Sequence, residues 1–365
     1  MYTNDNRTVI TLDAGGTNFV FGAMKGCEYV TTPITYPSNA HNLDLCLDTM
    51  VRGFREVIDS LDEKPVAISF AFPGPADYPN GIIGGYLPKF PSFRDGVALG
   101  PFLSNEFGIP VFINNDGDLF AYGEAICGAL PDINRRLAEA GSKKRYKNLL
   151  GYTFGTGFGF GCVINGALNI GDNSCVETFC LPHKTKEGII VEEGVAVRAI
   201  KRVYAEASGD HSHNFEPKEI CEIADGKRPG DIEAAKKAFA EFGETAGNAI
   251  AIAAQLIDGI IVIGGGITAA RHLILPSLMK ELRSTFTTLG GDSVKRVQME
   301  VFNLDDPAEF AAFAKGHTKT IAVRGTNRTV EFDDMKRIGI TFSKLGASRA
   351  ISAGAYAYAL TQIDA

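Results

Sequence analysis

An aspartate, two glycines and a threonine follow the first apolar segment of the chain. The sequence Asp13-Ala14-Gly15-Gly16-Thr17 places a carboxylate, two residues without side chains and a hydroxyl within one turn. Glycine lets backbone N–H groups approach phosphate oxygens, Thr17 can donate to one, and Asp13 can hold Mg²⁺ directly or through water. The pattern indicates a phosphate loop, but a Gly-Gly hairpin that serves only as a turn explains it as well.

Two later glycine clusters have the same ambiguity. Gly155-Thr156-Gly157, with Gly159 and Gly161 beyond it, leaves backbone exposed to a phosphate. The competing interpretation is a bent strand packed beneath a bulky neighbour. Gly264-Gly265-Gly266 follows an apolar strand and either brings a helix N-terminus to a nucleotide or makes a close-packed turn.

Asn115-Asp116 is the pair with the strongest acid–base potential. The strand-like run VFINN ends at Asn115, and Asp116 begins the turn into a helical pattern. A carboxylate at a strand end can accept the proton of an attacking hydroxyl, and a neighbouring amide can orient a sugar by bidentate hydrogen bonding. The alternative is that Asp116 is only the N-cap of the helix.

The strands and helices predicted around these residues indicate an α/β fold. Residues 8–24 predict a strand, a glycine turn and a second strand, and residues 43–61 have the spacing of an amphipathic helix. A buried strand over 66–72 ends in Pro73-Gly74-Pro75. Ligands bind at the carboxyl ends of strands in open α/β sheets, so Asp116 is well placed to meet one.

The second half of the chain repeats this organisation. Residues 149–168 again predict strand, glycine turn and strand, closed by an Asn165-Gly166 hairpin turn. A long helical pattern over 231–256 then precedes the strand that ends in Gly264-Gly265-Gly266. Two related lobes that face each other account for the repetition.

Composition narrows the classes of protein. The chain has 365 residues and a net charge of −7, so two lobes with their own cores fit, and general attraction to nucleic acid or anionic lipid does not. No apolar run reaches the length of a membrane span, and the N-terminus lacks a secretory signal pattern. We expect a cytoplasmic protein with a small-molecule substrate, whose seven cysteines form no disulfide.

The order of the motifs is similar to that of the ROK family of sugar kinases and repressors, within the actin-like ATPase superfamily. LDAGGTN, AFPGP, INNDGD, FGTGFGFGCVING and IIVIGGGI occur in sequence over nearly the whole chain. The resemblance implies an α/β fold of two actin-like, ribonuclease H-like lobes, each a mixed sheet flanked by helices, with a cleft between them. It also implies an ATP- and Mg²⁺-dependent kinase that phosphorylates a hexose hydroxyl.

The resemblance assigns roles to individual residues. Asp13, Gly15, Gly16 and Thr17 correspond to the first phosphate loop, with Mg²⁺ at Asp13, and Gly155, Thr156 and Gly157 to the second. Gly265 and Gly266 correspond to the adenosine-binding turn. Asp116 corresponds to the catalytic base, and three further residues correspond to sugar-binding positions: Gly74, Asn115 and Glu177.

The chain departs from the family on the sugar side. Thr178-Phe179-Cys180 follows Glu177, so the family's Glu-x-Gly-His motif is incomplete, and Tyr86-Leu87-Pro88 replaces its Asn-Leu. Asp118 replaces the second Asn of Asn-Asp-x-Asn. The cysteine knuckle is missing, and Cys175, Cys180 and His183 give three soft ligands without a fourth, so no zinc is expected.

The resemblance also predicts the limits of the lobes. The N-terminal lobe covers residues 1–116 and is completed by a C-terminal helix over about 346–365, and the C-terminal lobe covers 117–345. Strand-like runs around a helix that begins at Asp305-Asp306-Pro307 form an insertion over about 297–336. Its role is open between shaping a nucleotide or subunit contact and a surface elaboration without a catalytic part.

The sequence is compatible with two activities. One is a kinase acting on the 6-hydroxyl of glucose, mannose, fructose or an N-acetylhexosamine, assembled as a homodimer or homotetramer. The other is a catalytically weak sugar sensor. A repressor is disfavoured, because the first strand begins near Thr8 and leaves no room for a helix-turn-helix. Retention of Asp13 and Asp116 favours the kinase, because sugar binding alone needs no magnesium carboxylate.

Overall fold

The first apolar segment forms the predicted antiparallel hairpin. The computed structural model of the chain describes residues 2–74 and 76–365, so Pro75 of the AFPGP segment lies outside the described residues. β1 (Val9–Ala14) and β2 (Asn18–Lys25) pair along their length, with Asp13 opposite Val20. The glycine turn 15–17 connects them, as the sequence predicts.

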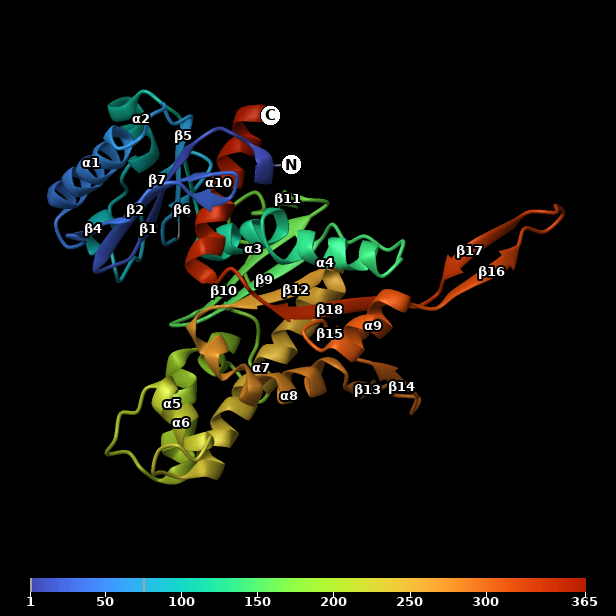
Figure 1. The fold of residues 1–365 in the computed structure, drawn as a ribbon. Helices are drawn as coiled ribbons and strands as arrows, with labels where there is room; N and C mark the ends of the chain where they lie inside the picture. Colours follow the sequence, from blue (N-terminus) through green and yellow to red (C-terminus); the bar gives the residue numbers. More distant parts are fainter. Residues whose placement is uncertain (1, 75) are drawn as a thin grey trace. The chain divides into compact units, whose positions relative to one another are not determined.

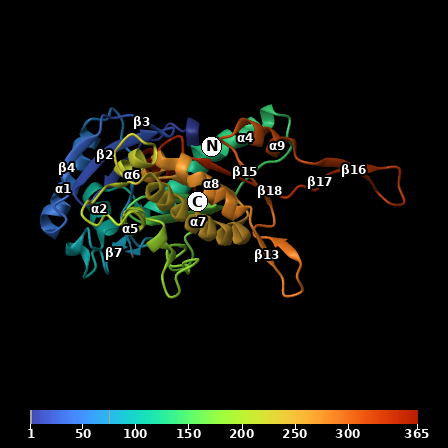
Figure 2. The ribbon, with the colours of Figure 1, turned by 90° about the horizontal axis from the view of Figure 1, so that it is seen from below.

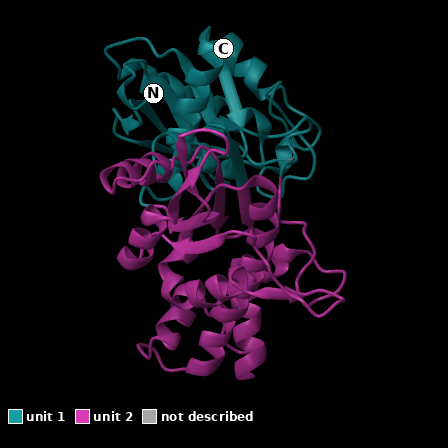
Figure 3. Cartoon of the chain, turned by 90° about the vertical axis from the view of Figure 1, so that its right-hand side faces the viewer, with its two compact units in different colours: residues 1–128, 161–176, 344–365 teal, residues 129–160, 177–343 magenta. Residues whose placement is uncertain are grey.

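The chain divides into two compact units, coloured separately in Figure 3. Unit 1 contains residues 1–128, 161–176 and 344–365, and unit 2 contains residues 129–160 and 177–343. The boundary predicted at Asp116 falls on the first residue of α3 (Asp116–Ile126). All of α3 belongs to unit 1, together with the C-terminal helix α10 (Ala347–Asp364).

Unit 1 is built on a six-stranded sheet of order β3-β2-β1-β5-β8, with β4 paired to β2. Its helices cover two faces of the sheet: α1 lies on one side and α10 on the other (Figure 1). Alternate residues of β1 serve the two layers, since Ile10 packs with Phe54 of α1 and Val9 packs with Tyr356 of α10. The remaining elements are β3 (Glu28–Tyr29), β4 (Ile34–Pro37), α1 (Leu43–Asp59), β5 (Ala67–Ala71), β6 (Ala76–Asp77), β7 (Ile82–Ile83), α2 (Leu99–Phe107), β8 (Val111–Asn114), and the 3-10 turns η1 (Tyr2–Asn4) and η2 (Pro91–Phe93).

Helices α3 and α10 cross at unusually close range. A Cβ atom on Gly123 would lie 1.9 Å from the backbone oxygen of Ala350, and one on Gly354 would lie 1.9 Å from that of Leu119. Glycine at both positions is therefore required for the backbones to approach. This contact fixes α3, and with it the Asn115-Asp116 pair at its start.

Two cysteines of unit 1 are paired, and the expectation of no disulfide is wrong for them. Cys27 follows β2 and Cys127 is the C-cap residue of α3, and their Cα atoms lie 6.1 Å apart in a disulfide. Both belong to the apolar cluster around Val9 and Tyr356. They are separated by 100 residues, so only the packing of α10 on the sheet and on α3 brings them together.

The second sheet has the order β11-β10-β9-β12-β18-β15 and lies mostly in unit 2. β12 (Ile260–Gly264) runs parallel to β9 (Leu149–Phe154) and to β18 (Arg337–Phe342). Residues of β10 (Phe158–Ile164) beyond Phe160, and β11 (Ala167–Leu168), are counted with unit 1. The helices of unit 2 are α4 (Ala129–Glu139), α5 (Val197–Ser208), α6 (Pro217–Ala224), α7 (Ile232–Ile257) and α8 (Arg271–Leu282), with 3-10 turns η3 (Val191–Gly194) and η4 (Gly266–Ala270).

The segment predicted as an insertion contributes one strand to this sheet and then leaves it. β15 (Glu300–Asn303) pairs with β18, and α9 (Pro307–Lys315) begins with Asp306 as N-cap and proline at its first turn, as predicted. β16 (Thr318–Ala322) and β17 (Thr329–Asp333) form a hairpin that projects from unit 2, as does the smaller pair β13 (Thr285–Thr287) and β14 (Ser293–Lys295) (Figures 1 and 2). Within residues 2–74 and 76–365, no helix combines the length and apolarity needed to cross a membrane.

Candidate active site

The carboxyl ends of three parallel strands in unit 1 meet at one sheet edge. Asp13 of β1 is in register with Ala71 of β5, and Ala71 is in register with Asn114 of β8. Asp13 near the end of β1, Gly74 after β5 and Asp116 after β8 therefore lie at the same sheet edge. The structure brings these predicted residues together because parallel pairing aligns strand ends that are far apart in sequence.

The first glycine loop is held tightly at this edge. A Cβ atom on Gly15 would lie 2.8 Å from the backbone oxygen of Asn18, so no larger residue fits. Buried Ser38 braces the loop, donating from its hydroxyl to the oxygen of Gly16 at 2.6 Å and from its amide to the oxygen of Thr17 at 2.9 Å. Asp13 and Thr17 themselves are exposed, and their hard oxygen atoms suit Mg²⁺ and phosphate.

The helix cap at β8 is Asn115. Its side-chain oxygen accepts from the Gly117 amide at 2.7 Å, and Asp116 is the first residue of α3. The alternative in which Asp116 is the N-cap therefore assigns the wrong residue. The oxygen of Asn115 is engaged with the helix, which leaves the amide N–H₂ as the group able to meet a sugar.

Asp116 is exposed as a residue, while its carboxyl group is held against the Gly117 amide and lies near other charges. Loss of hydration raises the pKa of its carboxyl group, while the Gly117 amide and the Lys89 ammonium act in the opposite direction. The Asp13 carboxylate adds to the rise. A carboxylate whose pKa is raised is a better proton acceptor than an ordinary aspartate.

Asp118, two residues further on, has a buried carboxyl group. Burial, with a smaller contribution from the charge of Asp116, raises the pKa of Asp118 to about 7. Near neutral pH a large fraction of Asp118 is thus a neutral acid that can donate a hydrogen bond, as an asparagine amide does. This property reduces the difference between Asp118 and the asparagine of the family pattern.

Gly74 has a local structural reason to be glycine. A Cβ atom there would lie 2.8 Å from the hydroxyl of Tyr78, which donates to the backbone oxygen of Phe72. The glycine thus lets Tyr78 close over the end of β5. Its predicted contact with a sugar stays a prediction.

The second glycine loop, in unit 2, is backed by charged residues that sequence reasoning missed. The Glu192 carboxylate accepts from the Phe158 amide at 2.9 Å, and a Cβ atom on Gly157 would lie 2.8 Å from it. Arg198 pairs with Glu192 at 2.8 Å and donates to the backbone oxygen of Thr156 at 3.3 Å. No motif marks either residue, because η3 and α5 supply them from about 40 positions downstream.

The predicted adenosine turn lies beside this second loop. Gly265 has a φ of 93°, and a Cβ atom on it would lie 2.3 Å from the oxygen of Phe154, the last residue of β9. Thr268 donates its hydroxyl to the Gly265 oxygen at 2.7 Å. Gly266 meets nothing within 4 Å and opens the 3-10 turn η4, which precedes the predicted helix. Parallel strands β9 and β12 thus bring Gly155-Thr156-Gly157 and Gly265-Gly266 to one edge of unit 2.

Glu177 and the soft ligands near it lie in irregular backbone. Glu177 is half-buried at the first position of the second segment of unit 2. Cys175 and Cys180 are exposed rather than buried. The role of Glu177 at the sugar stays a prediction.

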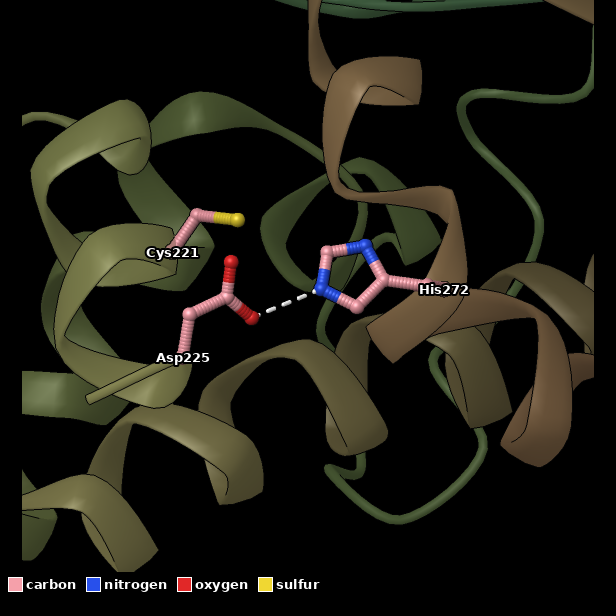
Figure 4. A group of neighbouring side chains, drawn as sticks. All are labelled: Cys221, Asp225 and His272. Carbon is pink, nitrogen blue, oxygen red and sulfur yellow. Dashed lines mark hydrogen bonds and ion pairs between the residues drawn. The ribbon is translucent and has the colours of Figure 1, made fainter. Parts of the chain in front are cut away.

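Within the described residues, the group of metal-ligating side chains that lie close together is Cys221, Asp225 and His272, not the segment around Cys175. Figure 4 shows His272 of α8 facing Asp225 at the end of α6, with 2.9 Å between Nε2 and Oδ1. Lys227 pairs with the other oxygen of Asp225 at 2.9 Å, and burial raises the pKa of the Cys221 thiol. These bonds describe a polar contact between α6 and α8, and the expected absence of zinc stays a prediction.

Comparison with known proteins agrees with the motifs. The model of the ROK family matches residues 9–300. A crystal structure of glucokinase from Parabacteroides distasonis is 58% identical, covers 99% of both chains and has a TM-score of 0.91. The glucokinase of Thermotoga maritima is 27% identical over 165 residues, which span 45% of this chain and 46% of that relative, less than two thirds of its length.

The fold extends to more distant members. A ROK family glucokinase from Streptomyces griseus, determined with glucose and AMPPNP, is 18% identical and has a TM-score of 0.61 over 96% of this chain and 98% of the other. The predicted α/β fold with mixed sheets flanked by helices is confirmed. Since the family model matches residues 9–300, which are most of the chain, the protein belongs to the ROK family.

Proposed function

We propose that this protein is an ATP-dependent sugar kinase that phosphorylates a hexose, and that glucose is its preferred hexose. The observation that carries the proposal is the sheet edge of unit 1, where a phosphate-type loop and an exposed carboxylate follow neighbouring parallel strands. The 58% identical glucokinase of Parabacteroides distasonis supports glucose over the other hexoses.

Asp116 accepts the proton of the sugar hydroxyl, and Asn115 and Gly74 hold the sugar beside it. Glu177 contacts the hydroxyls near the anomeric carbon. Phosphoryl transfer has a loose transition state, so much of the contribution of Asp116 is alignment of the attacking oxygen. The 6-hydroxyl is the acceptor that the family resemblance favours.

In unit 1 the backbone of the first glycine loop is suited to bind nucleotide phosphate, and in unit 2 the backbone of the second glycine loop and of the Gly265-Gly266 turn is suited to bind the nucleotide. Asp13 and Thr17 present the oxygen ligands that Mg²⁺ prefers, with Asp13 acting directly or through water. When bound, Mg²⁺ neutralises charge on the phosphate oxygens. Arg198 and Glu192 stabilise the second loop from behind.

The alternative is a sugar-sensing protein with weak catalysis, suggested by the altered residues after Glu177. A coupled assay of ADP release across glucose, mannose, fructose and two N-acetylhexosamines separates the two functions. Turnover with at least one hexose, absent without Mg²⁺, is the expected result. Sugar binding measured by calorimetry without ADP release would establish the sensor instead. Light scattering of the same preparation tests the homodimer or homotetramer that the resemblance favours.

A further inference from the structure

Lys89 lies at the sheet edge of unit 1 on a rigid support. The next residue, Phe90, is fully buried and stacks on Phe19 with ring centroids 6.0 Å apart and planes 12° apart. It also packs on Phe72, at 4.6 Å between centroids. Phe19 follows the first glycine loop in β2, and Phe72 directly follows β5, so Phe90 anchors Lys89 between two of the elements that form the site.

The stem of Lys89 lies directly over the glycine loop. A Cβ atom built on Gly16 would lie 3.0 Å from Cβ of Lys89, 3.4 Å from Cγ and 3.5 Å from Cδ. The methylene groups of Lys89 therefore occupy the space that glycine leaves, and they hold the side chain against the loop. The absence of a side chain at Gly16 thus serves Lys89 as well as phosphate.

The ammonium group is available to a ligand. Lys89 is exposed, and no carboxylate of residues 2–74 or 76–365 forms a salt bridge with it. Its positive charge lowers the pKa of Asp116, which shows that its field reaches the candidate base. The stem of Lys89 thus lies against the phosphate loop, and its charge acts on the residue that would receive the sugar proton.

The positive charge of Lys89 lies at a sheet edge that is otherwise rich in carboxyl groups. Asp13 and Asp116 place two carboxylates at the edge, and Asp118 is buried beside them. A transferring phosphoryl group carries negative charge on three oxygens and is repelled by carboxylates. A cation whose stem is held against the phosphate loop offsets this repulsion, because little reorganisation is needed when the charge develops.

We propose that the Lys89 ammonium group binds the phosphoryl group as it passes from ATP to the sugar, and holds it beside Asp116. The inference rests on the proposed kinase function. In the step, a lone pair of the sugar oxygen forms a bond to the γ-phosphorus, and the bond from that phosphorus to the β,γ-bridging oxygen breaks. The bridging oxygen keeps the electron pair and leaves with ADP, and the hydroxyl proton passes to the Asp116 carboxylate and then to solvent.

The test is steady-state kinetics of the full chain with glucose and Mg·ATP for Lys89→Met, Lys89→Arg and Lys64→Met. Lys64 is an exposed lysine of the same unit and serves as the matched control. Lys89→Met is expected to lower kcat by about 100-fold and leave the KM for glucose within about threefold, because the contact forms mainly during transfer. Lys89→Arg is expected to retain at least about tenfold more activity than Lys89→Met, and Lys64→Met to match the wild type.

A binding measurement complements the kinetics. Glucose 6-phosphate should raise the Tm of the wild type and of Lys64→Met more than that of Lys89→Met, whereas glucose should raise all three equally. Normal kcat in Lys89→Met, equal loss in the arginine and methionine variants, or an unchanged response to glucose 6-phosphate would each overturn the role of Lys89 alone. A wild type without turnover on any hexose would overturn the kinase function and the role of Lys89 with it.

Discussion

The side-chain oxygen of Asn115 accepts a hydrogen bond from the Gly117 amide at 2.7 Å, so the start of α3 is capped by the residue before Asp116. The Asp116 carboxylate also accepts from this amide, at 2.9 Å. Because Asn115 already provides the cap, Asp116 can be replaced without removing it. Stability and catalysis are therefore separable at adjacent positions.

Asp116→Asn is expected to lower kcat by about 10²- to 10⁴-fold, the usual contribution of a general base, and to leave the sugar affinity within a few-fold. The melting temperature should change little. Asn115→Ala is the matched comparison and should cost about 1 kcal/mol of stability through loss of the cap. Steady-state kinetics and melting curves on both variants separate the catalytic role of Asp116 from the capping role of Asn115. A folded Asp116→Asn enzyme with near-normal kcat removes Asp116 from the mechanism.

Asp118→Asn is expected to stabilise the protein at alkaline pH. In the folded protein Asp118 keeps its proton up to about pH 7, whereas the unfolded chain loses it near the ordinary value of 3.8. Between these pH values the folded state binds more protons, so the free energy of unfolding contributed by this group falls as pH rises. By pH 8 the raised pKa of Asp118 lowers the free energy of unfolding by about 4 kcal/mol at most.

Melting curves at pH 5 and pH 8 measure this effect. The gain of Asp118→Asn over the wild type should be larger at pH 8 than at pH 5. Asp95→Asn, an exposed aspartate of the same unit, should show no such difference. An equal effect of Asp118→Asn at both pH values would contradict the raised pKa.

Asp13→Asn and Glu177→Ala should affect different substrates. Removing the charge of Asp13 weakens the use of Mg·ATP, so the KM for Mg·ATP should rise and more Mg²⁺ should be needed. Glu177→Ala should instead raise the KM for the sugar and leave that for Mg·ATP unchanged. Initial rates over a grid of sugar and Mg·ATP concentrations separate the two. The reverse pattern would exchange the two assignments.

The disulfide between Cys27 and Cys127 predicts a thiol count. Protein denatured without reductant should show five free thiols, and seven after reduction. Loop-closure entropy predicts a loss of a few kcal/mol of stability on reduction, since the bridge links residues 100 apart. Cys27→Ser should have the melting temperature of the reduced wild type. In the folded protein, buried Cys46 should not react with a thiol reagent. Seven titratable thiols before reduction would rule out the bridge in solution.

The purified protein is expected to contain no stoichiometric zinc, because the cysteine knuckle is missing. Elemental analysis of the protein, before and after dialysis against a chelator, measures the content directly. His272→Ala serves as the control for the Cys221, Asp225 and His272 group, and should not change the metal content. One tightly held zinc per chain, with unfolding on chelation, would contradict the prediction.

The sequence by itself determined the elements and the family. Alternation of apolar residues predicted β1 and β2, three- and four-residue spacing predicted α1, and glycine clusters marked both loops. These signals are local, since side-chain period and glycine content depend on the backbone of a few consecutive residues. The insertion helix was also predicted correctly, because the Asp306 cap and Pro307 are local signals.

Tertiary structure decided which residues meet. Cys27 and Cys127 are joined only because α10 packs on both the sheet and α3, and Glu192 reaches the Phe158 amide only through the fold of unit 2. The position of Lys89 over Gly16 likewise depends on Phe90 being clamped between Phe19 and Phe72. Such contacts join residues tens of positions apart, and their geometry is set by packing of the cores, which no local pattern in the sequence records.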